Sequence, residues 1–166
     1  MAFQECLAVI LASEGGYTVD QGGPTNFGIT QRALSSYLGH AATIGDVMNL
    51  TAESVAPIYL SDYWNPAHCG MYANGVNLMV FDEAVNEGVG RAICHLQTAL
   101  GVTADGIVGS ETLDAENRAD PVTLINRLHD LNSAYYDSLA TIYPQDQAGW
   151  HARNDRTRVA ALKMVS

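Results

Sequence analysis

The chain has 166 residues, of which 48% are hydrophobic, and its 18 acidic residues outnumber its 8 lysines and arginines to give a net charge of −10. This length is enough for one compact domain with a buried core, and no apolar run approaches the roughly 20 residues that cross a bilayer. The acidic charge argues against nucleic-acid binding, because a basic surface is needed to displace counterions from phosphates.

The first predicted element is an amphipathic helix over residues 2–14. Phe3, Leu7, Ile10 and Glu14 follow one another at helical spacing, so Glu14 ends the apolar stripe. Burial and the negative end of the helix dipole both favour the protonated form of a carboxyl group. Such a group is suited to donate a proton during cleavage of a glycosidic bond. The alternative for a glutamate at a helix end is an ordinary surface position.

A glycine-rich loop follows this helix, with short strands predicted near residues 17–19 and 27–29. Within it, Asp20 is a candidate nucleophile, base or stabilising charge, and Thr25 is a candidate for holding an attacking water. Both residue types also favour turns, so a structural role is equally compatible with the sequence. Tyr17 is the strongest candidate in the loop for contact with a sugar.

The rest of the chain is predicted to be helical. Capping residues, apolar periodicity and glycine or proline stops predict helices over residues 30–38, 51–64, 74–85, 89–100, 110–117, 121–142 and 149–165. The expected fold is therefore mainly α, a helical bundle with a short hairpin or loop after the first helix.

Cysteines and cations give weaker signals. The chain has three cysteines, Cys6, Cys69 and Cys94. Their number is odd and their spacing is not that of metal ligands, so we expect no disulfide, no metal site and no cofactor. Four of the eight cations lie near the C-terminus, where they indicate either a solvated helix or contact with an anionic envelope surface: Arg153, Arg156, Arg158 and Lys163.

Two motifs near the N-terminus carry a resemblance to a known family. E-G-G-Y at residues 14–17 and G-G-P-T-N-F-G-I-T at residues 22–30 resemble the signature of glycoside hydrolase family 108. Its members are lysozyme-like N-acetylmuramidases of phage endolysins and bacterial secretion-activator-like proteins. The resemblance implies an α+β lysozyme-like fold in which Glu14 is the catalytic glutamate.

The resemblance supports some of the other candidate residues in this segment more than others. The loop that carries Asp20 is shorter than in the family pattern, which weakens the transfer of a catalytic role to that residue. The order of glutamate, turn and threonine is also similar to phage-type lysozymes, which supports Thr25. Asn26 and Tyr17, which belong to the same motifs, are the expected substrate contacts.

The second half of the chain also matches known patterns. F-D-E-A-V-N-E-G at residues 81–88 resembles another block of the family and suggests that Asn86 lies near the cleft. The pattern that runs from Leu96 to Leu113 resembles peptidoglycan-binding modules, in which Asp105 is either structural or a sugar contact. A catalytic segment at residues 1–88 and a peptidoglycan-binding-like segment at residues 89–166, packed as one compact domain, are therefore expected.

Together these patterns predict an endolysin that hydrolyses the β-1,4 bond between N-acetylmuramic acid and N-acetylglucosamine. We expect a monomer with peptidoglycan glycan strands as its partner, and no nucleic-acid partner or stable membrane insertion. The N-terminus lacks the basic segment of a signal peptide, so the host cytoplasm is the expected location before release to the cell wall. The alternatives are a lytic transglycosylase, which leaves 1,6-anhydro ends, and a non-catalytic wall-binding or secretion-associated protein.

Overall fold

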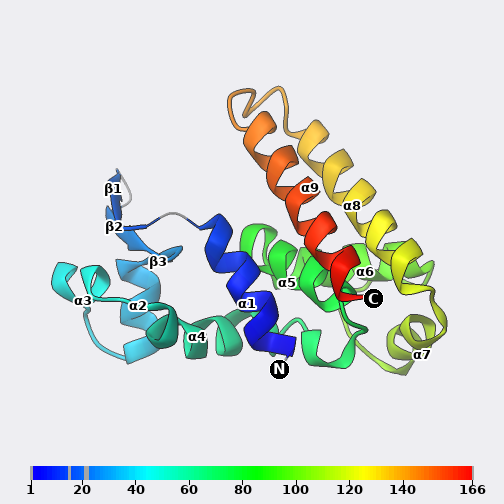
Figure 1. Cartoon of the computed structure of the whole chain (residues 1–166), viewed down its shortest axis with the longest axis horizontal. Helices are drawn as coiled ribbons and strands as arrows, with labels where there is room; N and C mark the ends of the chain where they lie inside the picture. The colour runs from blue at the N-terminus through cyan, green and yellow to red at the C-terminus, as the bar shows by residue number, and fades with distance from the viewer. Residues whose placement is uncertain (1, 15, 21–22, 166) are drawn as a thin grey trace. The chain divides into compact units, whose positions relative to one another are not determined.

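A computed structural model of the chain describes residues 2–14, 16–20 and 23–165, with the side chain of Asp20 outside this description. The chain divides into two compact units, one formed by residues 3–62 and the other mainly by the residues from 63 onward. Helices make up most of both units (Figure 1), which confirms the predicted mainly α fold. None of the helices in the described part is long and apolar enough to cross a membrane.

The first unit combines helices with a small antiparallel sheet. Its elements are α1 (Ala2–Ser13), β1 (Thr18–Asp20), β2 (Gly23–Asn26), β3 (Ile29–Thr30), α2 (Gln31–Leu38), α3 (Ile44–Met48) and α4 (Ala52–Tyr59). The strands pair in the order β1-β2-β3, and α2 and α3 lie beside them (Figure 1). The strand predicted near residues 27–29 is wrong in its first two residues, which form the turn between β2 and β3.

Side-chain caps begin the short helices of the first unit. The Thr30 hydroxyl accepts a hydrogen bond from Ala33 N at 3.1 Å and begins α2. Thr43 and Asp46 form a reciprocal capping box that begins α3, a helix absent from the sequence prediction. These hydrogen bonds from Thr43 lower the pKa of the Asp46 carboxyl.

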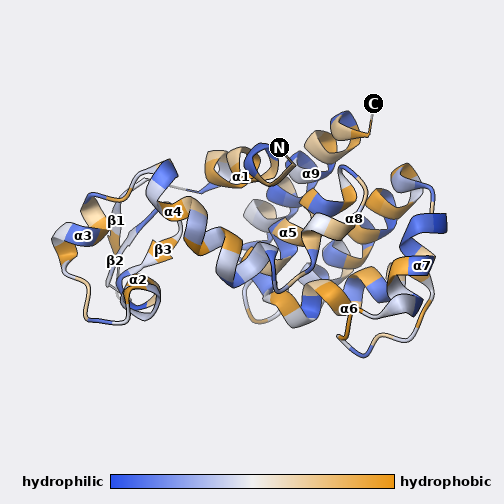
Figure 2. Cartoon of the chain, turned by 90° about the horizontal axis from the view of Figure 1, so that it is seen from below, coloured by the Kyte–Doolittle hydropathy of each residue, from blue (hydrophilic) through white to orange (hydrophobic). Residues whose placement is uncertain are grey.

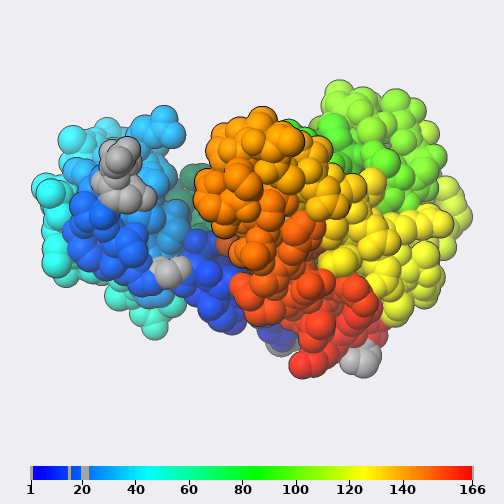
Figure 3. Space-filling model, turned by 90° about the horizontal axis from the view of Figure 1, so that it is seen from above, coloured from blue at the N-terminus to red at the C-terminus, as the bar shows by residue number. Residues whose placement is uncertain are grey.

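The second unit is a group of helices around α5. After a 3-10 turn at Cys69–Met71, its helices are α5 (Val76–Glu87), α6 (Val89–Leu100), α7 (Ser110–Arg118), α8 (Pro121–Ser138) and α9 (Gln147–Met164). The central helix α5 is almost fully buried and contacts α6, α8 and α9. Helices α8 and α9 lie side by side (Figures 1 and 3), and hydrophobic and hydrophilic residues alternate along α8 (Figure 2).

Two polar networks hold the second unit together. Arg153 on α9 donates two hydrogen bonds, of 3.0 and 2.9 Å, to Oδ1 of the buried Asp82 on α5. Gln97 is also buried and bonds to Asp105, Ile107 and Thr112 of the following loop and helix. Asp105 therefore has a structural role, which is one of the two alternatives that its motif suggested. Arg153, one of the four cations near the C-terminus, forms an ion pair within the fold.

Candidate functional site

Glu14 lies directly after the last residue of α1. Its backbone N–H donates to Ile10 O at 3.1 Å, which extends the helical pattern by one hydrogen bond. The side chain is half-buried, whereas the apolar stripe predicted a buried position. The helix ends at Ser13, so Glu14 leaves the buried face that Cys6, Leu7 and Ile10 occupy.

The turn between β2 and β3 faces this glutamate. Asn26 pairs with Ile29, so Phe27 and Gly28 form a two-residue hairpin turn, with φ values of 49° and 72°. Positive φ at both positions is the mark of a type I′ turn. For Phe27 this conformation costs roughly 1–2 kcal/mol relative to ordinary backbone.

Tyr59 from α4 supports the turn from inside the unit. Its side chain is 1% exposed, and its hydroxyl donates to Phe27 O at 2.9 Å. This hydrogen bond satisfies a turn carbonyl and helps to hold Phe27 in its left-handed conformation.

Glu14, Gly28 and Tyr59 meet at one point. A Cβ atom on Gly28 would lie 2.9 Å from Glu14 Oε2 and 2.6 Å from the Tyr59 hydroxyl oxygen. Real Cβ atoms essentially never come within 3.0 Å of another heavy atom in this way. Gly28 is therefore required both by its positive φ and by the space that the carboxylate and the phenol occupy. The sequence prediction did not include Tyr59.

Thr25 lies on the central strand of the sheet. It pairs with Thr18 of β1 and with Thr30 of β3, so the three threonines share one face. Thr25 is half-buried. Asp20 is the last residue of β1 and pairs with Gly23, but its candidate carboxylate lies outside the described part of the chain.

The three predicted substrate contacts differ in their surroundings. Tyr17 lies between Glu14 and β1 with 39% of its surface exposed, so its ring is open to a ligand. Asn26 is buried, and its amide nitrogen donates to Val47 O at 3.0 Å and Met48 O at 3.2 Å. This nitrogen holds β2 to α3. Asn86 is exposed on α5 in the second unit, where its amide donates to Asp82 O at 2.6 Å.

The second unit contains its own group of ionisable residues. Buried Glu83 on α5 pairs with His95 on α6. One turn further along α5, burial raises the pKa of the Glu87 carboxyl, and the charge of Glu83 acts in the same direction. Within the described residues, no three histidines, cysteines or acids are grouped closely enough to bind a metal ion.

Comparisons with known proteins give a consistent result over nearly the whole chain. The family described as Glycosyl hydrolase 108 matches residues 7–88, and a family described as Predicted Peptidoglycan domain matches residues 91–155. Twelve chains of solved structures match, among them SagA of Brucella abortus. That structure is 33% identical over 98% of this chain and 95% of its own, with a TM-score of 0.86. A search of curated proteins gives no match.

Proposed function

The chain belongs to the glycosyl hydrolase 108 family, and from this premise we propose that it is an N-acetylmuramidase with Glu14 as its general acid. Membership of this family identifies the protein as a glycoside hydrolase that acts on peptidoglycan. The bond we assign is the β-1,4 linkage between N-acetylmuramic acid and N-acetylglucosamine. The observation that carries the assignment is the placement of the Glu14 carboxylate against Gly28 and Tyr59.

The position of Glu14 supports its assignment as the proton donor. Glu14 is half-buried, and its carboxyl group lies beside the hydroxyl of Tyr59, a residue that is 1% exposed. A fixed position matters, because general acid catalysis requires the donor to reach the leaving oxygen at hydrogen-bond distance. In the reaction, Glu14 gives its proton to the glycosidic oxygen as the bond to the anomeric carbon breaks. Water then supplies the hydroxyl group at that carbon, and the proton that this water loses returns to Glu14 through the solvent and restores the acid.

Thr25 and Asp20 are the candidates for the opposite side of the sugar. A water held by the Thr25 hydroxyl would attack the anomeric carbon and give inversion, whereas an Asp20 carboxylate at short range would act as nucleophile and give retention. Thr25 belongs to the central strand of the sheet, which is a rigid place from which to hold a water. We therefore favour Thr25 and keep Asp20 as the second candidate.

The test is the variant Glu14→Gln, with Glu5→Gln as its control. Both remove one carboxylate from the same stretch of chain, but Glu5 is exposed on α1. We expect Glu14→Gln to keep its circular dichroism spectrum and melting temperature and to lose clearing of purified peptidoglycan, while Glu5→Gln clears normally. A folded Glu14→Gln protein that still clears the substrate would rule out the assignment.

Mass spectrometry of the wild-type digest identifies the reaction. Reducing N-acetylmuramic acid ends are expected for hydrolysis, whereas 1,6-anhydro ends would identify a lytic transglycosylase. Binding to sacculi with no released fragments would identify a non-catalytic wall-binding protein.

We further propose that the enzyme acts as an endolysin in host lysis, on the basis of its resemblance to phage endolysins. Cytoplasmic expression in a bacterial host with and without a holin tests this role. Lysis should require the holin and should disappear with Glu14→Gln.

A further inference from the structure

Tyr59 is a buried residue whose hydroxyl group lies at the candidate site. It is the last residue of α4 and is 1% exposed, and the chain continues directly from it as a π-helix at Leu60–Trp64. Short π-helical stretches are rare and are frequently found at functional sites. Burial therefore fixes the position of the Tyr59 ring, and the change of helix type beside it points to a role beyond packing.

The hydroxyl group of Tyr59 has one proton, and the Phe27 carbonyl takes it. Tyr59 donates to Phe27 O at 2.9 Å. A carbonyl oxygen can only accept, so this bond fixes the direction in which the hydroxyl proton points. Toward a further polar group the Tyr59 oxygen therefore offers lone pairs, which accept a hydrogen bond, and not a proton.

The Glu14 carboxyl group is a neighbour of this oxygen. A Cβ atom on Gly28 would lie 2.6 Å from the Tyr59 hydroxyl oxygen and 2.9 Å from Glu14 Oε2, so both oxygens border the space that one methyl group would fill. A protonated carboxyl group can donate to the lone pairs of Tyr59. An ionised one can only accept, so it would compete with the Phe27 carbonyl for a single proton.

We propose that Tyr59 is a positioning residue that stores the catalytic proton on Glu14 in the free enzyme. The Glu14 carboxyl group donates to the Tyr59 oxygen, and the Tyr59 hydroxyl donates to Phe27 O, so the three groups form one directional chain in which each bond strengthens the next. When the substrate enters, the O–H group of Glu14 turns to the glycosidic oxygen, which takes the proton as its bond to the anomeric carbon breaks. This inference rests on the proposed role of Glu14 as the general acid.

The elements around the turn carry other ionisable side chains. Asp46 belongs to the capping box of α3, Glu53 lines a cavity bordered by α1 and α4, and Arg32 and Asp62 line another cavity. The carboxyl group of Asp20, on β1, lies outside the described part of the chain. Two proteins that share all five side chains also share their charges, so a difference in pH dependence between them reports the hydroxyl group alone.

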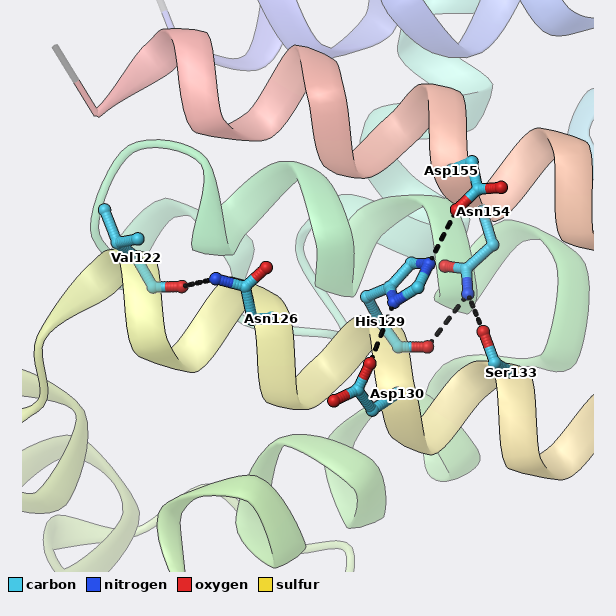
Figure 4. A network of polar contacts seen from close by, with 7 residues as sticks. All are labelled: Val122, Asn126, His129, Asp130, Ser133, Asn154 and Asp155. Atoms are coloured by element: carbon cyan, nitrogen blue, oxygen red, sulfur yellow. Dashed lines mark hydrogen bonds and ion pairs between the residues drawn. The ribbon is translucent and has the colours of Figure 1, made fainter.

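The variant Tyr59→Phe tests the proposal, with Ser133→Ala as its control. Each removes one hydroxyl group and one hydrogen bond of 2.9 Å, since Ser133 on α8 accepts from the Asn154 amide on α9 (Figure 4). Two quantities are followed against pH. One is the rate of peptidoglycan clearing at low substrate, which reports the free enzyme, and the other is the ¹³C signal of the Glu14 carboxyl group without substrate. Glu14→Gln identifies that signal by its loss.

The direction of the shift decides the result. Tyr59→Phe should move the alkaline fall in rate and the midpoint of the Glu14 titration to lower pH by about half a unit to one unit, the value of one hydrogen bond. Ser133→Ala should move neither. Loss of the hydroxyl group also makes the surroundings less polar, which alone would move the midpoint to higher pH. A shift to higher pH would show that the hydroxyl donates to Glu14, and an unchanged midpoint would show that Tyr59 only supports the turn; either result would overturn the proposal.

A measurement on the wild type keeps the proposal testable if Tyr59→Phe does not fold. Phe27 and Gly28 form the only Phe-Gly pair in the sequence, so ¹³C in phenylalanine carbonyls combined with ¹⁵N in glycine selects the Phe27 carbonyl. Its signal should change together with the Glu14 titration, because ionisation of Glu14 starts the competition for the Tyr59 proton. A carbonyl signal that does not follow Glu14 would overturn the proposal. Neither titration depends on activity, so failure of Glu14 as the general acid would be seen separately, in a Glu14→Gln protein that still clears peptidoglycan.

Discussion

Gly28→Ala is the substitution that tests most directly whether the position of Glu14 matters. The new Cβ would lie 2.9 Å from Glu14 Oε2 and 2.6 Å from the Tyr59 hydroxyl oxygen, whereas ordinary contact begins at 3.4 Å. Tyr59 is confined by burial, so the shorter contact, at its hydroxyl, is relieved only by a shift of the turn or of the ring that disturbs its hydrogen bond to Phe27 O, while the half-buried carboxyl group of Glu14 can move away. It must withdraw by about 0.5 Å, the tolerance within which a catalytic group has to be held.

The expected losses differ in size for stability and for activity. Alanine at φ 72° costs roughly 1–2 kcal/mol, and disturbance of the Tyr59–Phe27 hydrogen bond adds about 1 kcal/mol. At temperatures below the melting transition, activity should fall about 10- to 100-fold, because a displacement of the catalytic group by up to about 1 Å can reduce a rate by that factor.

Gly39→Ala is the matched control. Gly39 ends α2 with the same φ of 72°, but a Cβ there would meet nothing within 4 Å. It should therefore show the backbone cost alone, with normal activity. Urea unfolding gives the stability of each variant, and turbidity of a peptidoglycan suspension gives the rate. Equal activity of the two folded variants would refute the placement of Glu14 at this turn as a requirement for catalysis.

A double variant adds an internal check. Tyr59→Phe removes the oxygen that would lie 2.6 Å from the new Cβ and also the bond to Phe27 O. Combined with Gly28→Ala, it should lose less stability than the sum of the single variants, because one clash is relieved. Strict additivity would show that the alanine and the tyrosine do not interact.

Two further predictions concern groups away from the turn. Burial raises the pKa of Glu87 above the ordinary value of 4.5, so its contribution to stability is full below about that pH and is lost as the pH rises through the folded-state pKa. Urea unfolding across a pH series should show this fall in the wild type and a flatter profile in Glu87→Gln; parallel profiles would contradict it. Burial also raises the pKa of the Cys6 thiol to about 12, and Cys69 is buried while Cys94 is partly exposed. Alkylation of the native protein followed by peptide mass spectrometry should label Cys94 first, and early labelling of Cys6 would contradict that order.

The helices were predictable where local signals agreed. Thr51 with Ser54 caps α4, and Asp120 with Pro121 begins α8, as their residue types indicate. Helix α3 was missed because five residues are too few to show an apolar period, although Thr43 and Asp46 carry a capping-box signal. The predicted division at residues 88 and 89 follows motifs and stays a prediction.

The candidate site was only partly predictable, for a physical reason. Glu14 could be found from its own helix and the loop that follows. Tyr59 could not, because its bond to Phe27 joins residues 32 positions apart and no local pattern records such a contact. The turn was misread for a related reason. Its first position is Phe27, which has a positive φ. Asparagine or glycine is the usual residue at such a position, so the sequence gives no sign of this turn.

The same turn geometry bears on the choice between Thr25 and Asp20. Thr25 is paired on both sides, by Thr18 and Thr30, and its strand leads into the turn that meets Glu14. The Thr30 hydroxyl is already engaged as the cap of α2. Asp20, by contrast, ends an edge strand. A residue that positions a water needs a fixed backbone, and for this reason we propose Thr25 for the role, and with it an inverting reaction.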